Sequence, residues 1–229
     1  MIFPIVKLNE TFITGEPLMG ILSVWGDLGV GKTTLALQIA IATARFKKVV
    51  FIYTKPNFSL NKIGTLLQSD QSEVLDNLNF IKSLNFLDLY ELVFNFEFLN
   101  LKYLKRGANP INLLVIDSIT DLYRLELNKD KKEKNILLNY QLNQMLATLN
   151  YLNEKYKTEI LIINDLSRKV IDNQAIEMQG GGKVMDYWIN YSLKLMRMEK
   201  LNQIKIKLTK HPNRKNLTII STLTKDGFT

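Results

Sequence analysis

Gly26-Asp27-Leu28-Gly29-Val30-Gly31-Lys32-Thr33-Thr34 is the stretch that decides the fold of this chain, and it fits the pattern G-x-x-x-x-G-K-[ST]. The five residues before it, Ile21–Trp25, form a short apolar run typical of a buried strand. The residues after it, Leu35–Ala42, are good helix formers. A glycine-rich loop between a strand and a helix is the context in which this pattern cradles phosphate. The stretch is therefore predicted to be a nucleotide-binding loop.

The chemistry of this loop assigns a role to each kind of residue in it. Its glycines let backbone N–H groups close around a β-phosphate, and the dipole of the following helix adds positive potential. Lys32 is expected to reach the β- and γ-phosphates, and the Thr33 hydroxyl is expected to ligate Mg²⁺. The predicted nucleotide contacts are Gly26, Asp27, Leu28, Gly29, Val30, Gly31, Lys32, Thr33 and Thr34.

Length and composition indicate one α/β domain. The 229 residues are enough for a full core, 46% of them are hydrophobic, and the mean hydropathy is −0.03. Residues 1–19, with Pro4, Gly15 and Pro17, are expected to be a short lead-in with no room for another folded domain. No apolar run reaches the ~18 residues that span a bilayer, and the first residues do not form a basic region followed by an apolar core. With no cysteine, the chain is expected to be cytoplasmic, without membrane partners or thiolate metal sites.

Charge is the main compositional clue to partners. The chain carries a formal net charge of +8 and a sequence pI of about 9.4. Such a balance favours polyanions, because binding to them releases their counterions. A lysine-rich surface that only confers solubility is the alternative interpretation.

Apolar runs and turn residues alternate along the rest of the chain. Buried strands are expected at Lys48–Thr54, Leu78–Leu84, Ile111–Ser118 and Glu159–Asn164. Helices are expected at Leu60–Leu67, over the aromatic-rich Leu87–Leu104, and from the charged residues near Lys134 to about Tyr156. Asp165–Gly182 has no apolar period and is predicted to be a long functional loop. Tyr191–Arg197, Gln203–Thr209 and Leu217–Thr222 alternate like antiparallel strands at a sheet edge. The pattern predicts a doubly wound, mainly parallel sheet with antiparallel C-terminal edge strands.

Asp117 is the second predicted anchor of the nucleotide site. It ends the apolar run Leu113–Ile116, which is the form of a Walker B strand. Its carboxylate would hold Mg²⁺ beside Thr33. An ordinary turn after a buried strand is the alternative for Asp117 taken alone.

The motifs together resemble the RecA/RadA recombinase core, and most closely the small archaeal RadA paralogues of the RadB-like group. Beyond the loop at Gly26–Thr34, the shared pieces are Val49–Phe58, Leu113–Thr120, Ile162–Asp165, Gly181–Val184, Leu208–Pro212 and Thr224–Phe228. The resemblance covers about residues 15–228. It implies a single RecA-like P-loop ATPase core over residues 1–229 that binds ATP and Mg²⁺. It also implies that the N-terminal helix-hairpin-helix domain of full-length RadA is absent.

The resemblance further implies two loops that face DNA. The first would span about Arg124–Lys134 and the second Leu166–Gly182. The basic residues in or beside them, which are the predicted DNA contacts, are Arg124, Lys129, Lys131, Lys132, Lys134, Arg168, Lys169 and Lys183. Lysines contact phosphate without reading bases, so binding to single-stranded DNA is expected to be sequence-independent and salt-sensitive. Because Asp130 and Glu133 lie among these lysines, a solvated helix start is the alternative for the first loop.

One departure from the family pattern concerns catalysis. RadA-type enzymes carry a water-activating Glu after the second strand, where this chain has Lys55. No Asp or Glu lies between Asp27 and Asp70, and Ser118 follows Asp117. Loss of a general base costs ~10²–10⁴ in rate, so weak or absent ATP hydrolysis is expected. A displaced acid, Asp165 or Asp121, is the alternative. Lys55 itself could stabilise a bound triphosphate or be a solvated loop lysine.

Two further positions bear on neighbouring subunits. Lys210-His211 lies where subunits of the family touch ATP across an interface, and Lys210 is the better candidate for such a contact because it keeps its charge. Phe3–Val6 only faintly resembles the Phe-x-x-Ala patch through which recombinases polymerise, so a homo-oligomer is possible but long filaments are not expected.

The combined expectation is an accessory protein that binds ATP–Mg²⁺ and single-stranded DNA and modulates a RadA-type recombinase. Two alternatives remain open at this point. One is a DNA-stimulated ATPase with a displaced base, and the other is a RecA-superfamily regulatory ATPase with no DNA function.

Overall fold

The computed structural model describes residues 1–229 except 13–14, 57–59, 68–71, 129 and 172–173. Its strands are β1 (Ile21–Gly26), β2 (Val49–Tyr53), β3 (Leu78–Lys82), β4 (Leu113–Asp117), β5 (Glu159–Ile171), β6 (Gln174–Gln179), β7 (Ile189–Arg197), β8 (Gln203–Lys210), β9 (Thr218–Thr224) and β10 (Gly227–Phe228). Its helices are α1 (Val6–Phe12), α2 (Lys32–Ala44), α3 (Leu60–Leu67), α4 (Ser72–Asn77), α5 (Phe86–Phe94), α6 (Phe96–Lys105), α7 (Asp121–Glu126), α8 (Lys132–Tyr156) and α9 (Gly182–Trp188).

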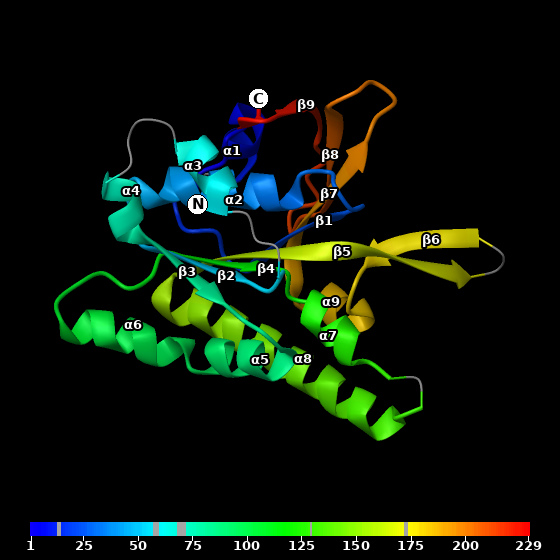
Figure 1. The fold of residues 1–229 in the computed structure, drawn as a ribbon, viewed down its shortest axis with the longest axis horizontal. Helices are drawn as coiled ribbons and strands as arrows, with labels where there is room; N and C mark the ends of the chain where they lie inside the picture. The colour runs from blue at the N-terminus through cyan, green and yellow to red at the C-terminus, as the bar shows by residue number, and fades with distance from the viewer. Residues whose placement is uncertain (13–14, 57–59, 68–71, 129, 172–173) are drawn as a thin grey trace.

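A single twisted sheet runs through the described part of the molecule in the order β10-β9-β8-β7-β1-β5-β4-β2-β3, and β6 pairs with β5 alone (Figure 1). β1, β5, β4, β2 and β3 are mutually parallel, and β7 is parallel to β1. β8, β9 and β10 continue the sheet in antiparallel pairs. The predicted mainly parallel α/β fold with antiparallel C-terminal strands is confirmed.

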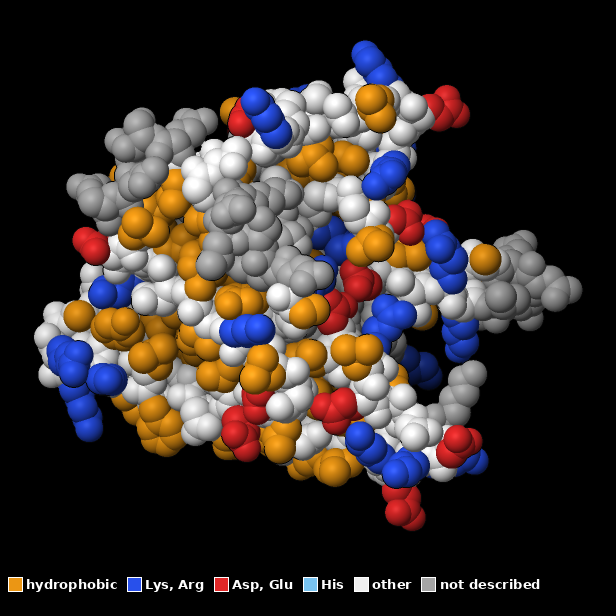
Figure 2. Space-filling view, viewed as in Figure 1, with side chains coloured by type: hydrophobic (Ala, Val, Ile, Leu, Met, Phe, Trp, Pro, Cys, Tyr) orange, Lys and Arg blue, Asp and Glu red, His pale blue; other side chains and the backbone are white. Residues whose placement is uncertain are grey.

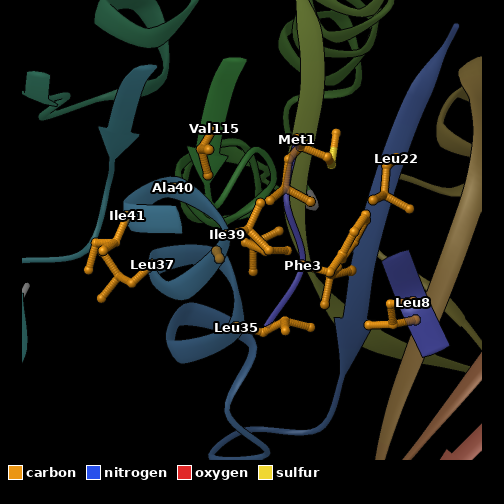
Figure 3. Close-up of a cluster of buried hydrophobic side chains, with 14 of the residues drawn as sticks. Met1, Phe3, Leu8, Leu22, Leu35, Leu37, Ile39, Ala40, Ile41 and Val115 are labelled. Atoms are coloured by element: carbon orange, nitrogen blue, oxygen red, sulfur yellow. The ribbon is translucent and has the colours of Figure 1, made fainter. Parts of the chain in front are cut away.

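Helices cover both faces of the parallel region, as its buried strands require. On one face α2 lies against the sheet with α1 and α3, and on the other α5, α6 and α8 do so (Figure 1). Figure 3 shows part of the core on the α2 face of the sheet, here called the first core, to which Leu35 and Ile39 of α2, Leu22 of β1 and Val115 of β4 belong; Leu37 lies beside Ile41 on another side of α2. Burial on two faces explains why these strands are continuous apolar runs in the sequence.

The lead-in of the chain is more structured than expected. α1 packs its Leu8 and Phe12 into the first core, and the Phe3 ring stacks on that of Phe12 with 5.1 Å between centroids. The Phe3 side chain is buried in its own chain. It is therefore not displayed as a polymerisation patch in this structure, consistent with the weak match of Phe3–Val6.

The prediction of a long loop at Asp165–Gly182 is wrong. β5 continues to Ile171, and β6 pairs back on it in antiparallel register from Leu166–Gln179 to Ile171–Gln174. The resulting β5–β6 hairpin projects beyond the sheet (Figure 1). α9 lies beside the base of the hairpin, but the described side chains from Arg168 to Glu177 are exposed. Neither face of this part needs apolar residues, so the sequence lacks the alternation by which strands are recognised.

Three smaller expectations also need correction. The helical stretch Leu87–Leu104 is two helices, α5 and α6, separated at Asn95, whose ψ is 0°. The first expected DNA loop, Arg124–Lys134, is shorter than predicted, because α7 ends at Glu126 and α8 begins at Lys132, which leaves residues 127–131 between the two helices. The Tyr191–Arg197 strand is antiparallel only to β8, since its other neighbour, β1, is parallel to it.

Candidate nucleotide site and nucleic-acid interface

The predicted phosphate loop has the backbone that its glycines permit. Gly26, Gly29 and Gly31 have φ values of +147°, +74° and +88°, in the region that side chains rarely adopt. Gly31 is the N-cap of α2, whose first residue is Lys32. The first N–H groups of α2 therefore lie at the end of the loop, where a helix favours anions.

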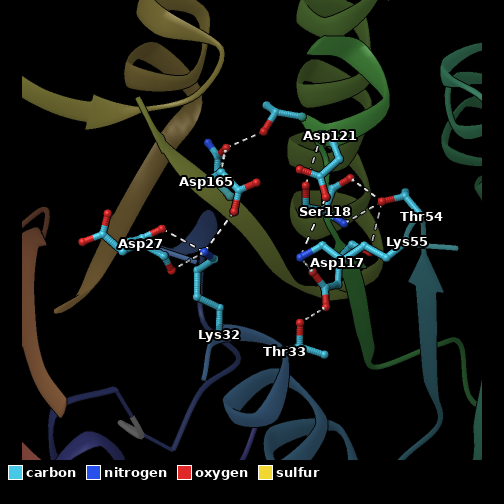
Figure 4. Close-up of polar contacts among 12 residues, drawn as sticks. Asp27, Lys32, Thr33, Thr54, Lys55, Asp117, Ser118, Asp121 and Asp165 are labelled. Carbon is cyan, nitrogen blue, oxygen red and sulfur yellow. Dashed lines mark hydrogen bonds and ion pairs between the residues drawn. The ribbon is translucent and has the colours of Figure 1, made fainter. Parts of the chain in front are cut away.

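Lys32 is buried at the centre of this loop. Its Nζ donates to the carbonyl oxygens of Gly26 at 2.8 Å and Asp27 at 2.9 Å, and it lies 2.9 Å from Oδ1 of Asp165 (Figure 4). Two of the three ammonium hydrogens are donated to backbone carbonyls, and the contact with Asp165 is an ion pair, since Oδ1 of Asp165 has no hydrogen-bond partner in the described part of the chain. The predicted phosphate-binding lysine is thus held at the loop by two carbonyls and one carboxylate.

The predicted Mg²⁺ ligands are brought together. Thr33 Oγ1 donates to Oδ2 of Asp117 at 2.6 Å, although the two residues lie on different elements, α2 and β4. The other carboxylate oxygen of Asp117 is buried and has no hydrogen-bond partner in the described part of the chain. An orphaned carboxylate oxygen beside a hydroxyl is the donor set that Mg²⁺ and its waters prefer, so these residues fit the ion.

Burial raises the pKa of Asp117, and the charge of Lys55 opposes that rise most strongly. Among the described residues no cluster of three or more His, Cys, Asp or Glu side chains could hold a metal by itself. Both observations agree with a site in which the ion arrives together with a phosphate ligand, since Mg²⁺ is often bound by one or two carboxylates plus substrate phosphates.

Lys55 points into this site from the end of β2. Its Nζ lies 3.8 Å from Oδ1 of Asp117 and 3.8 Å from Oδ2 of Asp121, and its side chain is one-third exposed (Figure 4). The interpretation of Lys55 as a solvated loop lysine is therefore wrong. Position 55 therefore faces the acidic centre, and its correspondence to the catalytic Glu of RadA-type enzymes stays a prediction.

Two further carboxyl groups face the lysines of the site: Asp165 lies beside Lys32, and Asp121 lies beside Lys55. Burial and the hydrogen bond to ionised Asp165 raise the pKa of Asp121 to about 6. Burial alone would raise the pKa of Asp165, but hydrogen bonds from Asp121 and Lys32 outweigh it and lower that pKa. Asp165 is therefore the more acidic of the two, and Asp121 is the one that takes up a proton as the pH falls towards about 6.

Two residues that sequence reasoning missed complete the surroundings. Thr54 Oγ1 accepts from the Ser118 N–H at 2.9 Å and so fixes the turn after Asp117. Arg197, at the end of β7, donates to the carbonyl oxygen of Gly29 at 3.3 Å. Arg197 reaches the phosphate loop because β7 is parallel to β1, a pairing that no signal in the sequence specifies.

Lys210 does not reach the nucleotide site of its own chain. It ends β8 opposite Ser192, near the start of β1, whereas the phosphate loop follows the other end of β1. Its Nζ donates to the carbonyl oxygen of Asp186, and the neighbouring His211 ring lies against Phe12 and Tyr191. A contact with nucleotide on a neighbouring subunit stays a prediction.

The predicted DNA residues fall into two groups at the edge of the sheet where the phosphate loop lies. Around α7 and α8, Arg124, Lys131 and Lys132 are exposed, and Lys134 pairs with Glu126 at 3.4 Å. Lys129 lies outside the described residues. Lys132 and Lys134 lie in the first turn of α8 and are exposed. The alternative interpretation, a solvent-exposed start of a helix, therefore describes these two residues better than a loop does.

The second group lies on the β5–β6 hairpin and beside it. Figure 2 shows lysine and arginine side chains around the base of this hairpin. Arg168 Nη2 lies 3.2 Å from both Asp27 Oδ1 and Glu177 Oε1, so it links the hairpin to the phosphate loop. Lys169 and Lys183 are exposed. Gln179 anchors the end of β6 through hydrogen bonds with Ser23 and Ser192.

None of the helices within the described ranges is long and apolar enough to cross a membrane.

Comparison with known proteins identifies the family. The Rad51 family model matches residues 6–229. The "DNA repair and recombination protein RadB" of Methanocaldococcus jannaschii is 30% identical over 194 residues, which are 84% of each chain. Proteins of the same name are 31% identical in a Methanococcus maripaludis strain, over 83% of this chain and 82% of the relative, and 30% identical in Methanoculleus marisnigri, over 91% and 88%. The chain therefore belongs to the Rad51 family, as a RadB-like paralogue of RadA within the RecA superfamily.

Proposed function

We propose that this protein binds ATP–Mg²⁺ and single-stranded DNA and acts in DNA recombination and repair, where it modulates a RadA-type recombinase. The observation that carries the nucleotide part is the junction of Lys32, Thr33 and Asp117 at one edge of the sheet. The names of the RadB relatives support the recombination part. Bound Mg²⁺ would neutralise phosphate charge between Thr33 and Asp117.

Weak or absent hydrolysis belongs to the same proposal. The position expected to hold the water-activating Glu carries Lys55, whose ammonium faces Asp117 and Asp121. A cation cannot accept the proton of an attacking water, and it stabilises the negative charge of a bound triphosphate. The site is thus suited to holding nucleotide rather than turning it over.

Lys32→Ala is expected to weaken ATP–Mg²⁺ binding by roughly 10- to 100-fold, because charge-assisted hydrogen bonds to phosphate are lost. Isothermal titration calorimetry with a non-hydrolysable ATP analogue measures this directly. Lys105→Ala, at the far end of α6, removes the same charge away from the site and should leave the affinity unchanged. Equal affinity in wild type and Lys32→Ala would refute the proposed nucleotide site.

Arg168→Ala with Lys169→Ala is expected to weaken binding to single-stranded DNA. It should also reduce the slope of log affinity against log salt by about 0.7 for each phosphate that the variant no longer neutralises. Fluorescence anisotropy with a labelled oligonucleotide at several salt concentrations gives both values.

The matched control for the hairpin variant is Lys102→Ala with Lys105→Ala on α6, which removes two charges at the far end of the molecule from the hairpin (Figure 1). This control should lower affinity less and keep the salt slope. If the two double variants behave alike, the hairpin is not where DNA binds, and net charge alone accounts for binding.

A further inference from the structure

Lys32 of the phosphate loop is already paired with a carboxylate of its own chain in this structure. Lys32 gives two of its three hydrogens to backbone carbonyls of its own loop, and its remaining neighbour is Oδ1 of Asp165 at 2.9 Å. A phosphate oxygen that binds Lys32 must therefore replace Asp165 or crowd against it.

Asp165 is held firmly in this position. Its backbone pairs with Gly26 at the end of β1, its N–H donates to Asn164 Oδ1 at 2.8 Å, and its carbonyl accepts from Gly180 N at 2.9 Å. With three-quarters of its side chain buried, Asp165 is part of the site rather than a mobile surface group.

Sheet order shows which phosphate Asp165 faces. β5 lies between β1, which leads into the phosphate loop, and β4, which carries Asp117. Asp165 therefore stands between the lysine of the loop and the predicted Mg²⁺ ligand (Figure 4). In P-loop sites the metal bridges the β- and γ-phosphates, so the terminal phosphate of a triphosphate enters this gap.

We propose that Asp165 is a specificity-determining residue that occupies Lys32 in place of a terminal phosphate oxygen and so biases the site towards nucleoside diphosphate over triphosphate. Repulsion between the carboxylate and the γ-phosphate adds to the competition for Lys32. Lys55 offsets only part of it, since its ammonium is shared between Asp117 and Asp121. This inference rests on the proposed nucleotide binding and adds which nucleotide the site selects.

The test compares the affinities for ADP–Mg²⁺ and for a non-hydrolysable ATP analogue with Mg²⁺, at one pH and ionic strength, in wild type and Asp165→Asn. Asparagine keeps the shape and removes the charge. The ratio of triphosphate to diphosphate affinity is expected to rise by at least about tenfold. Glu154→Gln is the control: it also removes one carboxylate, but Glu154 is exposed near the C-terminal end of α8, which leads into the end of β5 remote from Asp165, so this variant should keep the wild-type ratio.

Each outcome separates this inference from the proposed function. If both nucleotides bind and Asp165→Asn leaves their ratio unchanged, Asp165 does not select between them, and nucleotide binding still stands. If Asp165→Asn and Glu154→Gln raise the ratio equally, the loss of negative charge alone is responsible, and the proposed role of Asp165 is refuted. If no form of the protein binds either nucleotide, the proposed function fails as well. A thermal melt of each variant confirms that the protein compared is folded.

Discussion

Lys55→Glu combined with Asp165→Gln is expected to raise the steady-state rate of ATP hydrolysis by roughly 10²–10⁴-fold, the usual contribution of a positioned general base. The first change restores the Glu that the resemblance places at position 55, and the second removes the carboxylate that pairs with Lys32. Position 55 points at Asp117 and Asp121, so a carboxylate there would face the region where the terminal phosphate is expected. Phosphate release measured with saturating ATP, with and without single-stranded DNA, gives the rate.

The structure explains why both changes are needed. Lys55→Glu alone turns a centre of three carboxylates and two ammoniums into one of four carboxylates and one ammonium. The new carboxylate would be protonated or repelled, and triphosphate would bind less well. Replacing Asp165 by Gln removes one of those charges and frees Lys32. The single variants are therefore expected to hydrolyse far more slowly than the double variant.

Two results would contradict this account of the site. One is a wild-type turnover already similar to that of the double variant, which would mean that another acid activates water. The other is a double variant that binds ATP with high affinity and still does not hydrolyse it, which would mean that the missing base is not what limits turnover.

Gly26→Ala is expected to lower the free energy of unfolding by about 2–5 kcal/mol and to abolish high-affinity nucleotide binding. The φ of Gly26 is +147°, and a Cβ there would collide with the carbonyl oxygen of Leu195 on the neighbouring strand β7. Since that atom belongs to the backbone of a buried strand, it cannot move aside. Urea denaturation gives the stability, and calorimetry with nucleotide gives the affinity.

Gly64→Ala is the control for this prediction. Gly64 lies in α3 and is exposed, and no described atom lies within 4 Å of the position that an alanine Cβ would take. Alanine should therefore stabilise the protein by up to ~1 kcal/mol through helix propensity. A Gly26→Ala protein as stable as wild type would show that β1 and β7 are not packed as closely as the structure has them.

Much of the fold could be predicted because the informative segments are buried on two sides. The runs at Val49–Tyr53, Leu113–Asp117 and Glu159–Asn164 have the continuous apolar character of parallel strands, and all three lie where expected. The phosphate loop was equally predictable, because its glycines and Lys32-Thr33 are dictated by local backbone geometry and ligand chemistry.

The β5–β6 hairpin was missed for the opposite reason. It projects from the sheet and is held by pairing between its own backbones, with a polar anchor at Gln179. Side chains on its two faces need not differ in polarity, so the sequence carries no alternating signal. The break at Asn95 between α5 and α6 likewise leaves little signal in the sequence, because residues with helical apolar spacing continue across it.

The sequence by itself determined that this chain has a phosphate loop, a buried strand ending in Asp117, and a lysine where a base is expected. Each of those depends on neighbours along the chain or on residue chemistry alone. Only the tertiary structure decided that Lys32 meets Asp165, that Lys55 faces Asp117 and Asp121, and that Arg197 reaches Gly29. These contacts follow from sheet order, which places residues distant in the chain at one edge, and short-range patterns carry no information about that order.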